Sequence, residues 1–301
     1  MSHAPPGAVV VGYDGTPHAA QAVAWAATEA ARRGTALHVV YAADSSGLVP
    51  GPVGVSPWLP ERAVAIATDV ALGGVERARR VAPDLEVSHL AETGSAAGVL
   101  VDESAGAALL VVGTRGHGEL AGTLLGSVAF AVSAHAPCPV VVVRGPGAAT
   151  RHPGPGRAVV VGVDGSKASA AALHFAVRTA VEAYAPLLVV SAWHPTAAET
   201  WEAAYWTSLH PGAELGEAAR RAAERVVEEA VTDARRAAPQ LAVRTETAGG
   251  SADLVLADFS SGAGLLVVGA RGRGGFAGLL LGSVSHGVIH RSACPVAVVR
   301  A

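Results

Sequence analysis

Short apolar runs alternate along the chain with longer alanine-rich stretches of helical periodicity. The runs consist largely of Val and Leu without polar alternation, which is typical of parallel strands buried on both faces. They predict strands at 8–13, 36–42, 85–90, 108–113 and 139–144, and again at 158–163, 186–192, 241–246, 264–269 and 295–300. The stretches between predict helices at 17–33, 59–82, 95–104 and 124–135, and again at 167–184, 213–238, 251–260 and 280–292. This alternation predicts an open α/β sheet of five parallel strands per half, with flanking helices and right-handed crossovers.

The second half of the chain repeats the first. Residues 108–144 align without a gap on 264–300, with 22 identical positions. The start VVVGYDGTPHAA, at 9–20, corresponds to VVVGVDGSKASA, at 159–170. The period of about 150 residues is too long for a solenoid unit and indicates a duplicated domain.

The segment RGPGAATRHPGPGR, at 144–157, is dense in Gly and Pro and is expected to be a linker. The predicted domains are therefore 1–148 and 156–301. Each half ends in an apolar strand, at 139–144 and 295–300, which would leave a sheet edge exposed. We therefore expect the halves to pack as a pseudo-twofold pair, and further association of chains into a homodimer is a second expectation.

Composition, charge and motif content exclude several classes of protein and site. The formal net charge is −3 and the pI is near 6.5, so no bulk electrostatic attraction favours nucleic acid or an anionic membrane. No apolar run approaches the roughly 18 residues of a membrane span, and the N-terminus lacks the pattern of a secretory signal. The histidines show no HExxH motif or clustered ligand spacing, so no metal site built from protein ligands is expected. A soluble cytoplasmic protein is the resulting prediction.

Two loops in each half follow a predicted strand and carry residues suited to a nucleotide. The first loop contains Asp14, or Asp164 in the second half, which could accept hydrogen bonds from adenine or ribose or hold Mg²⁺. The second loop is glycine-rich: Gly113 and Gly116 would let the backbone approach a ligand without interference from a Cβ atom. After nine intervening residues, Gly126-Ser127 opens a helix whose free N–H groups attract phosphate.

The same spacing recurs in the second half. The corresponding residues are Gly269, Gly272, Gly282 and Ser283. Each signal has an alternative interpretation, since Asp before Gly is common in turns and a glycine-rich loop can be a tight turn or a flexible connection. Charges beside the loops would neutralise phosphates or simply be solvated; they are Arg115, His117, Arg271 and Arg273.

The pattern G-x2-G-x9-G-[ST] after a strand, paired with an Asp at the end of the first strand, resembles the ATP-binding branch of the universal stress proteins. The resemblance covers essentially the whole chain as two tandem domains, including the closing CPVVVVR and CPVAVVR. It implies a strand order of 3-2-1-4-5 in each domain. The family often has Pro where Ser95 and Ser251 stand here, which affects only a helix start.

The resemblance also implies which residues would meet the ligand. Adenine would meet Asp14 and the backbone of Val39, or Asp164 and the backbone of Val189. Ribose and phosphates would meet Gly113, Gly116, Gly126 and Ser127, or Gly269, Gly272, Gly282 and Ser283. Val128 and Val284 follow these serines as they do in the family.

The implied function is that of an ATP-binding regulatory protein, with Mg²⁺ accompanying the nucleotide and occupancy acting as the signal. A weak ATPase is one alternative, although no G-x4-GK-[ST] motif occurs and Lys167, the only lysine, lies outside the glycine segments. A sensor of another adenine nucleotide, such as cyclic AMP, is a second alternative. The tryptophan-rich segment 193–206 could be a lid over the second site, a packed loop or an association surface.

Overall fold

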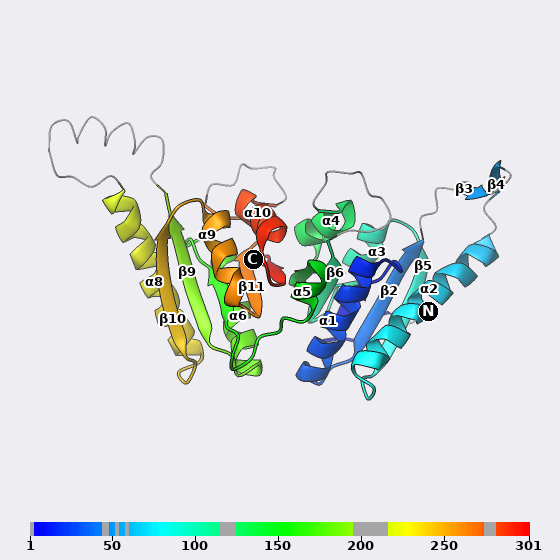
Figure 1. The fold of residues 1–301 in the computed structure, drawn as a ribbon, viewed down its shortest axis with the longest axis horizontal. Coiled ribbons are helices and arrows are strands. Elements are labelled where there is room, and N and C mark those ends of the chain that lie inside the picture. The colour runs from blue at the N-terminus through cyan, green and yellow to red at the C-terminus, as the bar shows by residue number, and fades with distance from the viewer. Residues whose placement is uncertain are drawn as a thin grey trace. The chain divides into compact units, whose positions relative to one another are not determined.

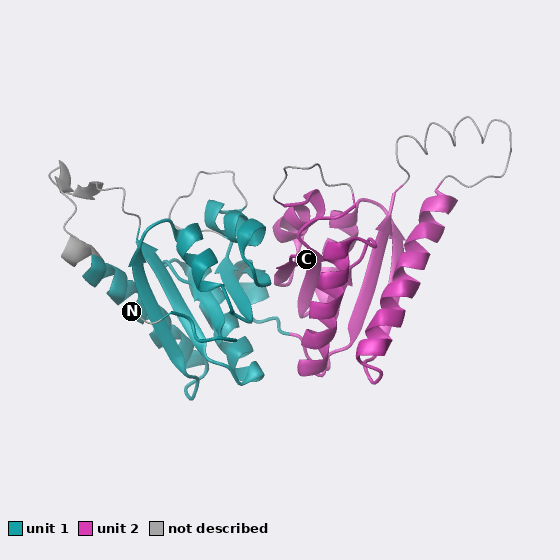
Figure 2. Ribbon diagram, turned by 180° about the vertical axis from the view of Figure 1, so that it is seen from behind, with its two compact units in different colours: residues 1–152 teal, residues 153–301 magenta. Residues whose placement is uncertain are grey.

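The computed structural model describes residues 3–43, 48–51, 54–57, 60–114, 125–194, 216–273 and 281–301. The chain divides into two compact units, residues 1–152 and 153–301, coloured separately in Figure 2. Each unit is an α/β domain in which helices flank a parallel sheet (Figure 1). The α/β class expected from the alternating pattern is confirmed. Among the described helices, none is long and apolar enough to cross a membrane.

The first unit contains a five-stranded parallel sheet in the order β5-β2-β1-β6-β7. Its strands are β1 (Val9–Gly12), β2 (Leu37–Ala43), β5 (Val87–Thr93), β6 (Leu109–Gly113) and β7 (Val140–Val143). Its longer helices are α1 (Pro17–Arg33), α2 (Pro60–Val81), α3 (Ala96–Glu103) and α4 (Ser127–His135). A two-stranded antiparallel hairpin, which the apolar pattern did not predict, joins β2 to α2 and consists of β3 (Leu48–Gly51) and β4 (Gly54–Pro57).

The second unit repeats this sheet in the order β10-β9-β8-β11-β12. Its strands are β8 (Val159–Gly162), β9 (Leu187–Trp193), β10 (Val243–Gly249), β11 (Leu265–Gly269) and β12 (Val296–Val299). Its described helices are α6 (Lys167–Glu182), α8 (Glu217–Ala237), α9 (Ala252–Phe259) and α10 (Ser283–Arg291), with a 3₁₀ turn η1 at Ser260–Gly262. In chain order both sheets read 3-2-1-4-5, as the family resemblance implied.

Local sequence signals explain where the first helix of each unit begins. Thr16 caps α1 by accepting a hydrogen bond from the N–H of Ala19 at 3.3 Å, and Pro17 occupies the first helical position. Ser166 caps α6 in the same way, at 3.1 Å from the N–H of Ser169. Both caps are local features of the sequence, a Thr or Ser directly before the first helical residue. They place a short loop with its Asp at the carboxyl end of the central strand.

The outermost strands lie further along the chain than predicted. The apolar pattern predicted strands at 85–90 and 241–246, whereas β5 and β10 end three residues later, at Thr93 and Gly249. Each outer strand pairs along its length with one inner strand, β2 or β9, and carries polar residues. The apolar runs therefore did not mark these strand ends, because an outer strand is not buried on both faces.

The expected linker is partly structured. Residues Gly145–Ala149 form a short helix, α5, in the first unit. The indole N–H of Trp25 on α1 donates to the carbonyl of Arg151 at 2.9 Å, and its ring stacks on His152 with centroids 5.3 Å apart. This anchoring by a distant tryptophan is a tertiary contact, which Gly and Pro density alone did not reveal. Of the tryptophan-rich segment 193–206, residues 195–206 lie outside the described ranges.

Candidate functional site

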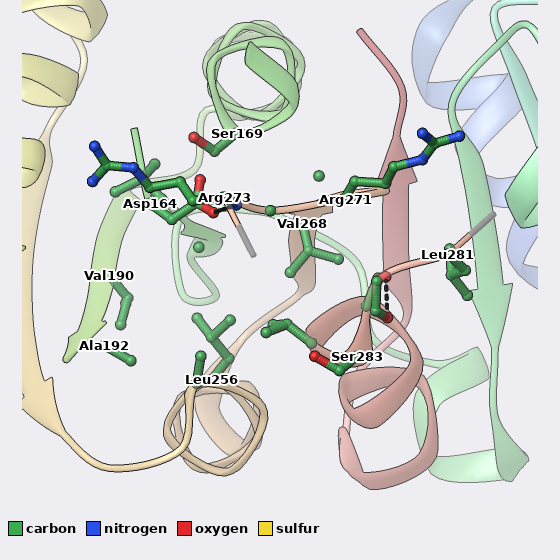
Figure 3. A pocket seen from close by; sticks show the side chains of 18 residues that line it. Asp164, Ser169, Val190, Ala192, Leu256, Val268, Arg271, Arg273, Leu281 and Ser283 are labelled. Carbon is green, nitrogen blue, oxygen red and sulfur yellow. Dashed lines mark hydrogen bonds between the residues drawn. The ribbon is translucent and has the colours of Figure 1, made fainter. Parts of the chain in front are cut away.

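The second unit contains a cavity of about 510 Å³ at the carboxyl ends of β8 and β11 (Figure 3). These strands are neighbours at the point where the strand order reverses, which is where open α/β sheets bind ligands. The volume lies within the roughly 300–1,000 Å³ of small-molecule pockets. Its apolar wall includes Val163, Val190, Ala192, Leu256, Val268 and Leu281. Its polar groups come from Asp164, Ser169, Arg271, Arg273, Ser283 and Ser285.

Asp164 is fixed by the turn that leads from β8 into α6. Gly165 adopts a φ of 78°, a left-handed conformation that favours glycine and lets the chain reverse after the carboxylate. The Oδ1 atom of Asp164 accepts the N–H of Ser166 at 2.9 Å, and Oδ2 accepts the N–H of Arg273 at 2.9 Å. Burial by itself would raise the pKa of Asp164, but the hydrogen bonds from Ser166, Arg273 and Ser169 together hold the pKa below its ordinary value. The carboxylate is therefore a negative charge at neutral pH.

The first glycine of each glycine segment lies against the backbone of a neighbouring helix. A Cβ atom on Gly269 would lie 2.8 Å from the carbonyl carbon of Ala168, in the first turn of α6. Gly113 in the first unit would likewise meet the carbonyl oxygen of His18 at 2.8 Å. The absence of a Cβ atom at these positions thus makes room for the backbone of the neighbouring helix, and the predicted contact of the two glycines with a ligand stays a prediction. They line the cavities because the strands end there.

The glycine segment ends at a helix start that faces the cavity. Gly282 precedes α10 and provides no side-chain cap, so the first N–H groups of α10 have no capping side chain. The N–H of Gly282 donates to the carbonyl of Ala270 at 2.8 Å, which brings the start of α10 beside the end of β11. The hydroxyl of Ser285 is directed to the carbonyls of Ala270 and Gly282, at 3.1 and 2.9 Å. The exposed Ser283 is thus the hydroxyl of α10 that is best placed for a ligand.

Arg271 and Arg273 bring positive charge to the cavity from the chain after β11. Both are exposed, and their side chains extend in opposite directions in Figure 3, with Arg273 on the side of Asp164. A long exposed guanidinium can turn towards a bound phosphate and donate two hydrogen bonds to it. The cavity therefore joins an apolar wall to a cationic, N–H-bearing rim.

A matching cavity of about 390 Å³ lies in the first unit. It is lined by Asp14, Gly126, Ser127 and Val128 among the predicted residues, and by Leu100 and Val112 on its apolar side. Asp14 accepts both the N–H and the hydroxyl of Thr16, at 3.0 and 2.6 Å. Arg115 and Gly116, as well as His117, lie outside the described residues, so their predicted roles stay predictions.

Tyrosines distinguish the first cavity from the second. Tyr13 and Tyr41 line it, and the Tyr13 hydroxyl accepts a hydrogen bond from the Nε of Arg77 at 3.0 Å. Burial, together with the nearby negative charge of Asp14, raises the pKa of Tyr41. The position of Tyr13 corresponds to Val163 in the second unit, so the two cavities have different walls.

Val39 and Val189, on the second strand of each sheet, are not among the residues that line the cavities. The residues that line the cavities are Val40 and Val190. Val39 and Val189 are fully buried, and Val39 packs towards Gly74 of α2. Because side chains alternate across a strand, only every second residue can face the cavity. Any role of Val39 and Val189 therefore concerns the main chain alone, as the resemblance implied.

Several lining residues had no signal in the sequence. Leu100 and Leu256 come from α3 and α9, far along the chain from β1 and β8, and fill the space above Gly12 and Gly162. Ser285 corresponds to Ala129 in the first unit, so the repeat gave no reason to select it. Within the described ranges, no group of three or more His, Cys, Asp or Glu side chains is placed to hold a metal ion.

Comparison with known proteins places this architecture in a family. A family model described as Universal stress protein family matches the chain twice, over residues 7–144 and 156–300. Universal stress protein Rv2623 of Mycobacterium tuberculosis (strain ATCC 25618 / H37Rv) is 35% identical over 297 residues, covering 97% of this chain and 96% of that protein. Universal stress protein Rv2005c of the same strain is 32% identical over 306 residues, with the same coverage.

Solved structures agree on the fold. A universal stress protein from Archaeoglobus fulgidus DSM 4304 matches with a TM-score of 0.68 over 97% of this chain and 96% of that chain, at 17% identity. A putative universal stress protein from Pseudomonas aeruginosa UCBPP-PA14 matches with a TM-score of 0.58 over 98% of this chain and 93% of that chain, at 18% identity. Since the family pattern occurs in both halves and the curated relatives match over nearly their full length, this chain belongs to the universal stress protein family, in its tandem two-domain form.

Proposed function

We propose that each cavity binds an adenine nucleotide, ATP together with Mg²⁺, and that occupancy rather than turnover is the signal. The observation that carries the proposal is the composition of the second cavity. Its wall is apolar, with Val190, Leu256 and Val268, and its rim carries the uncapped start of α10 and two arginines. A planar base requires the first environment and a phosphate chain the second.

The residues divide naturally between the parts of the ligand. The apolar side chains would hold the base, while the N–H groups of α10, Ser283, Arg271 and Arg273 would hold the phosphates. Mg²⁺ usually binds through substrate phosphates with few protein ligands. Asp164, the only carboxylate among the residues that line the second cavity, already accepts a main-chain N–H with each of its oxygens. The metal would thus arrive with the nucleotide and neutralise part of its charge.

Stoichiometry tests this proposal directly, because matched alanines line the two cavities. Ala96 begins α3 beside the first cavity, and Ala252 begins α9 beside the second. We expect calorimetric titration with MgATP to give two sites per chain, and Ala96→Trp or Ala252→Trp to leave one site each by filling one cavity. The double variant is the control and should bind none. Nucleotide released by heat denaturation and identified by mass spectrometry would show which adenine nucleotide copurifies; two sites in the double variant would place binding elsewhere.

Hydrolysis is expected to be slow. The groups around the second cavity stabilise phosphates in the ground state, whereas catalysis requires interactions that strengthen in the transition state. Among the described lining residues, Asp164 is the only candidate to orient a water molecule, and both its oxygens already accept main-chain N–H groups. We expect turnover well below about 1 s⁻¹, a rate at the low end of typical enzymes. Faster phosphate release that is lost in the double tryptophan variant would identify an ATPase instead, and preferential displacement of ATP by cyclic AMP would identify a cyclic-nucleotide sensor.

A further inference from the structure

Asp164 joins two loops that are far apart in sequence. Its Oδ1 atom accepts the N–H of Ser166 at the start of α6, and its Oδ2 atom accepts the N–H of Arg273 in the glycine segment, both at 2.9 Å. Residues 164 and 273 are 109 positions apart, so this contact exists only in the folded domain. A half-buried carboxylate that accepts main-chain N–H groups forms stronger hydrogen bonds than a neutral acceptor would.

Gly272 fits this contact closely. A Cβ atom at position 272 would lie 2.6 Å from the Oδ2 atom of Asp164, closer than real Cβ atoms approach an oxygen. Gly272 is not among the glycines of positive φ, so its backbone conformation does not by itself require glycine. The atom that a side chain at 272 would displace is thus the carboxylate oxygen that holds Arg273.

The hydrogen bond to Asp164 also fixes where the Arg273 side chain starts. The Nη1 atom of Arg273 lies 3.8 Å from the position that a Cβ on Gly165 would occupy, so the guanidinium rests over the Asp164 turn at the cavity rim. Figure 3 shows Arg273 on this side and Arg271 directed away from it. The hydrogen bond between the N–H of Arg273 and Asp164 therefore positions two groups at the cavity: the backbone of the glycine segment and the Arg273 guanidinium.

We propose that Asp164 is a positioning residue that holds the Gly272–Arg273 backbone and so shapes the phosphate-binding part of the second site, rather than a residue that selects adenine. Gly272 is glycine because this carboxylate occupies the space of its side chain. The inference rests on the proposed nucleotide binding and differs from the adenine contact that the family resemblance implied. The depressed pKa of Asp164 agrees with it, because the ionised form is the better acceptor for both N–H groups.

A double-mutant cycle tests the proposal in the full chain with the first cavity filled by Ala96→Trp. The variants are Asp164→Ala, Gly272→Ala and the two combined, each titrated with MgATP and with adenosine. We expect each single substitution to weaken ATP binding by about tenfold or more while adenosine binding changes by less than about twofold. The combined variant is expected to bind ATP no worse than either single variant, since without the carboxylate an alanine at 272 meets nothing. Asp164→Asn, which keeps the side-chain volume, is expected to show the same selective loss.

Other results of these titrations would overturn the positioning role of Asp164. An equal loss of adenosine and ATP affinity in Asp164→Ala would assign Asp164 to the base or ribose, and multiplicative losses in the combined variant would show that Gly272 makes room for the ligand. If the Ala96→Trp parent bound no nucleotide, the proposed function would fail at this site. Amide hydrogen exchange would still decide the positioning role, because the N–H of Arg273 is expected to be protected in the parent and to exchange faster in Asp164→Ala. Unchanged exchange would refute it.

Discussion

Replacing Glu103 with alanine is expected to lower the free energy of unfolding of the first unit by about 3 kcal/mol. Glu103, the last residue of α3, is 4% exposed, and its carboxylate accepts the N–H of Ala4 at 2.8 Å and bonds His3 at 2.6 Å. Its Oε2 atom also lies 3.5 Å from the Nε2 atom of the fully buried His38. The truncation removes a charged acceptor and leaves the Nε2 atom of His38 without its polar neighbour, while the Nδ1 atom keeps its hydrogen bond with the hydroxyl of Ser88 at 2.8 Å. Urea denaturation, with amide exchange in β1 and β2 as the reporter and in β8 and β9 as the internal control, would measure the loss.

The duplicated unit supplies the matched control. In the second unit Leu188 occupies the register position of His38, and Phe259 ends α9 as Glu103 ends α3. The variant His38→Leu/Glu103→Phe replaces the polar pair by the apolar pair, and such replacements are often neutral or stabilising when the volume fits. We expect it to be more stable than Glu103→Ala alone. Equal stability of the two variants would show that the polar contact around Glu103 contributes nothing specific.

His38 is also expected to make the stability of the first unit depend on pH. Burial lowers the pKa of His38, and although the charge of Glu103 opposes this shift, the net result is a folded-state pKa below the ordinary 6.5. The folded state therefore holds His38 neutral, so its contribution to stability is complete above pH 6.5 and is lost as the pH falls towards the folded-state pKa. His3, whose pKa is raised by Glu103, acts in the opposite sense but is exposed to solvent. We expect the stability of the wild type to fall below pH 6.5 more steeply than that of His38→Leu; parallel profiles would contradict this.

Replacing Gly269 with alanine is expected to destabilise the second unit by about 2 kcal/mol before any effect on binding is considered. The added Cβ would lie 2.8 Å from the carbonyl carbon and 3.0 Å from the carbonyl oxygen of Ala168, which are backbone atoms in the first turn of α6. The helix would have to move away from β11, because a backbone cannot turn aside as a flexible side chain can. Thermal unfolding, with amide exchange in β8 and β11, is the measurement.

Gly262 provides the matched control on the same unit. A Cβ atom there would have no heavy atom within 4 Å, and Gly262 is not among the glycines of positive φ. Gly262→Ala is therefore expected to change stability by less than about 1 kcal/mol. A similar loss at both positions would mean that glycine flexibility, and not the contact with α6, determines the cost. In the first unit Gly113→Ala is expected to behave like Gly269→Ala, since it meets the carbonyl of His18 at 2.8 Å.

Much of the fold could be predicted from the sequence because the inner strands are continuous runs of Val and Leu. A run such as VVVG in β1 is buried on both faces, so its hydrophobicity marks its position without reference to the rest of the chain. The caps Thr16 and Ser166 are equally local signals. The ends of β5 and β10 and the anchored segment after β7 were missed, because they depend on pairing with another strand or on contact with Trp25.

For the candidate site, the sequence by itself determined which loops converge: parallel strands bring their carboxyl ends to one edge of the sheet, so Asp164, Gly269 and Ser283 had to lie near one another. It did not determine what each residue does there. The motif spacing gives Gly269 and Gly272 the same role. In the structure, however, a Cβ atom on Gly269 would meet a helix backbone, whereas a Cβ atom on Gly272 would meet a carboxylate. Likewise, only the folded domain brings Leu256 over Gly162 and Asp164 to the N–H of Arg273. The physical reason is that strand and helix patterns are local, whereas a close contact depends on two surfaces that the fold alone brings together.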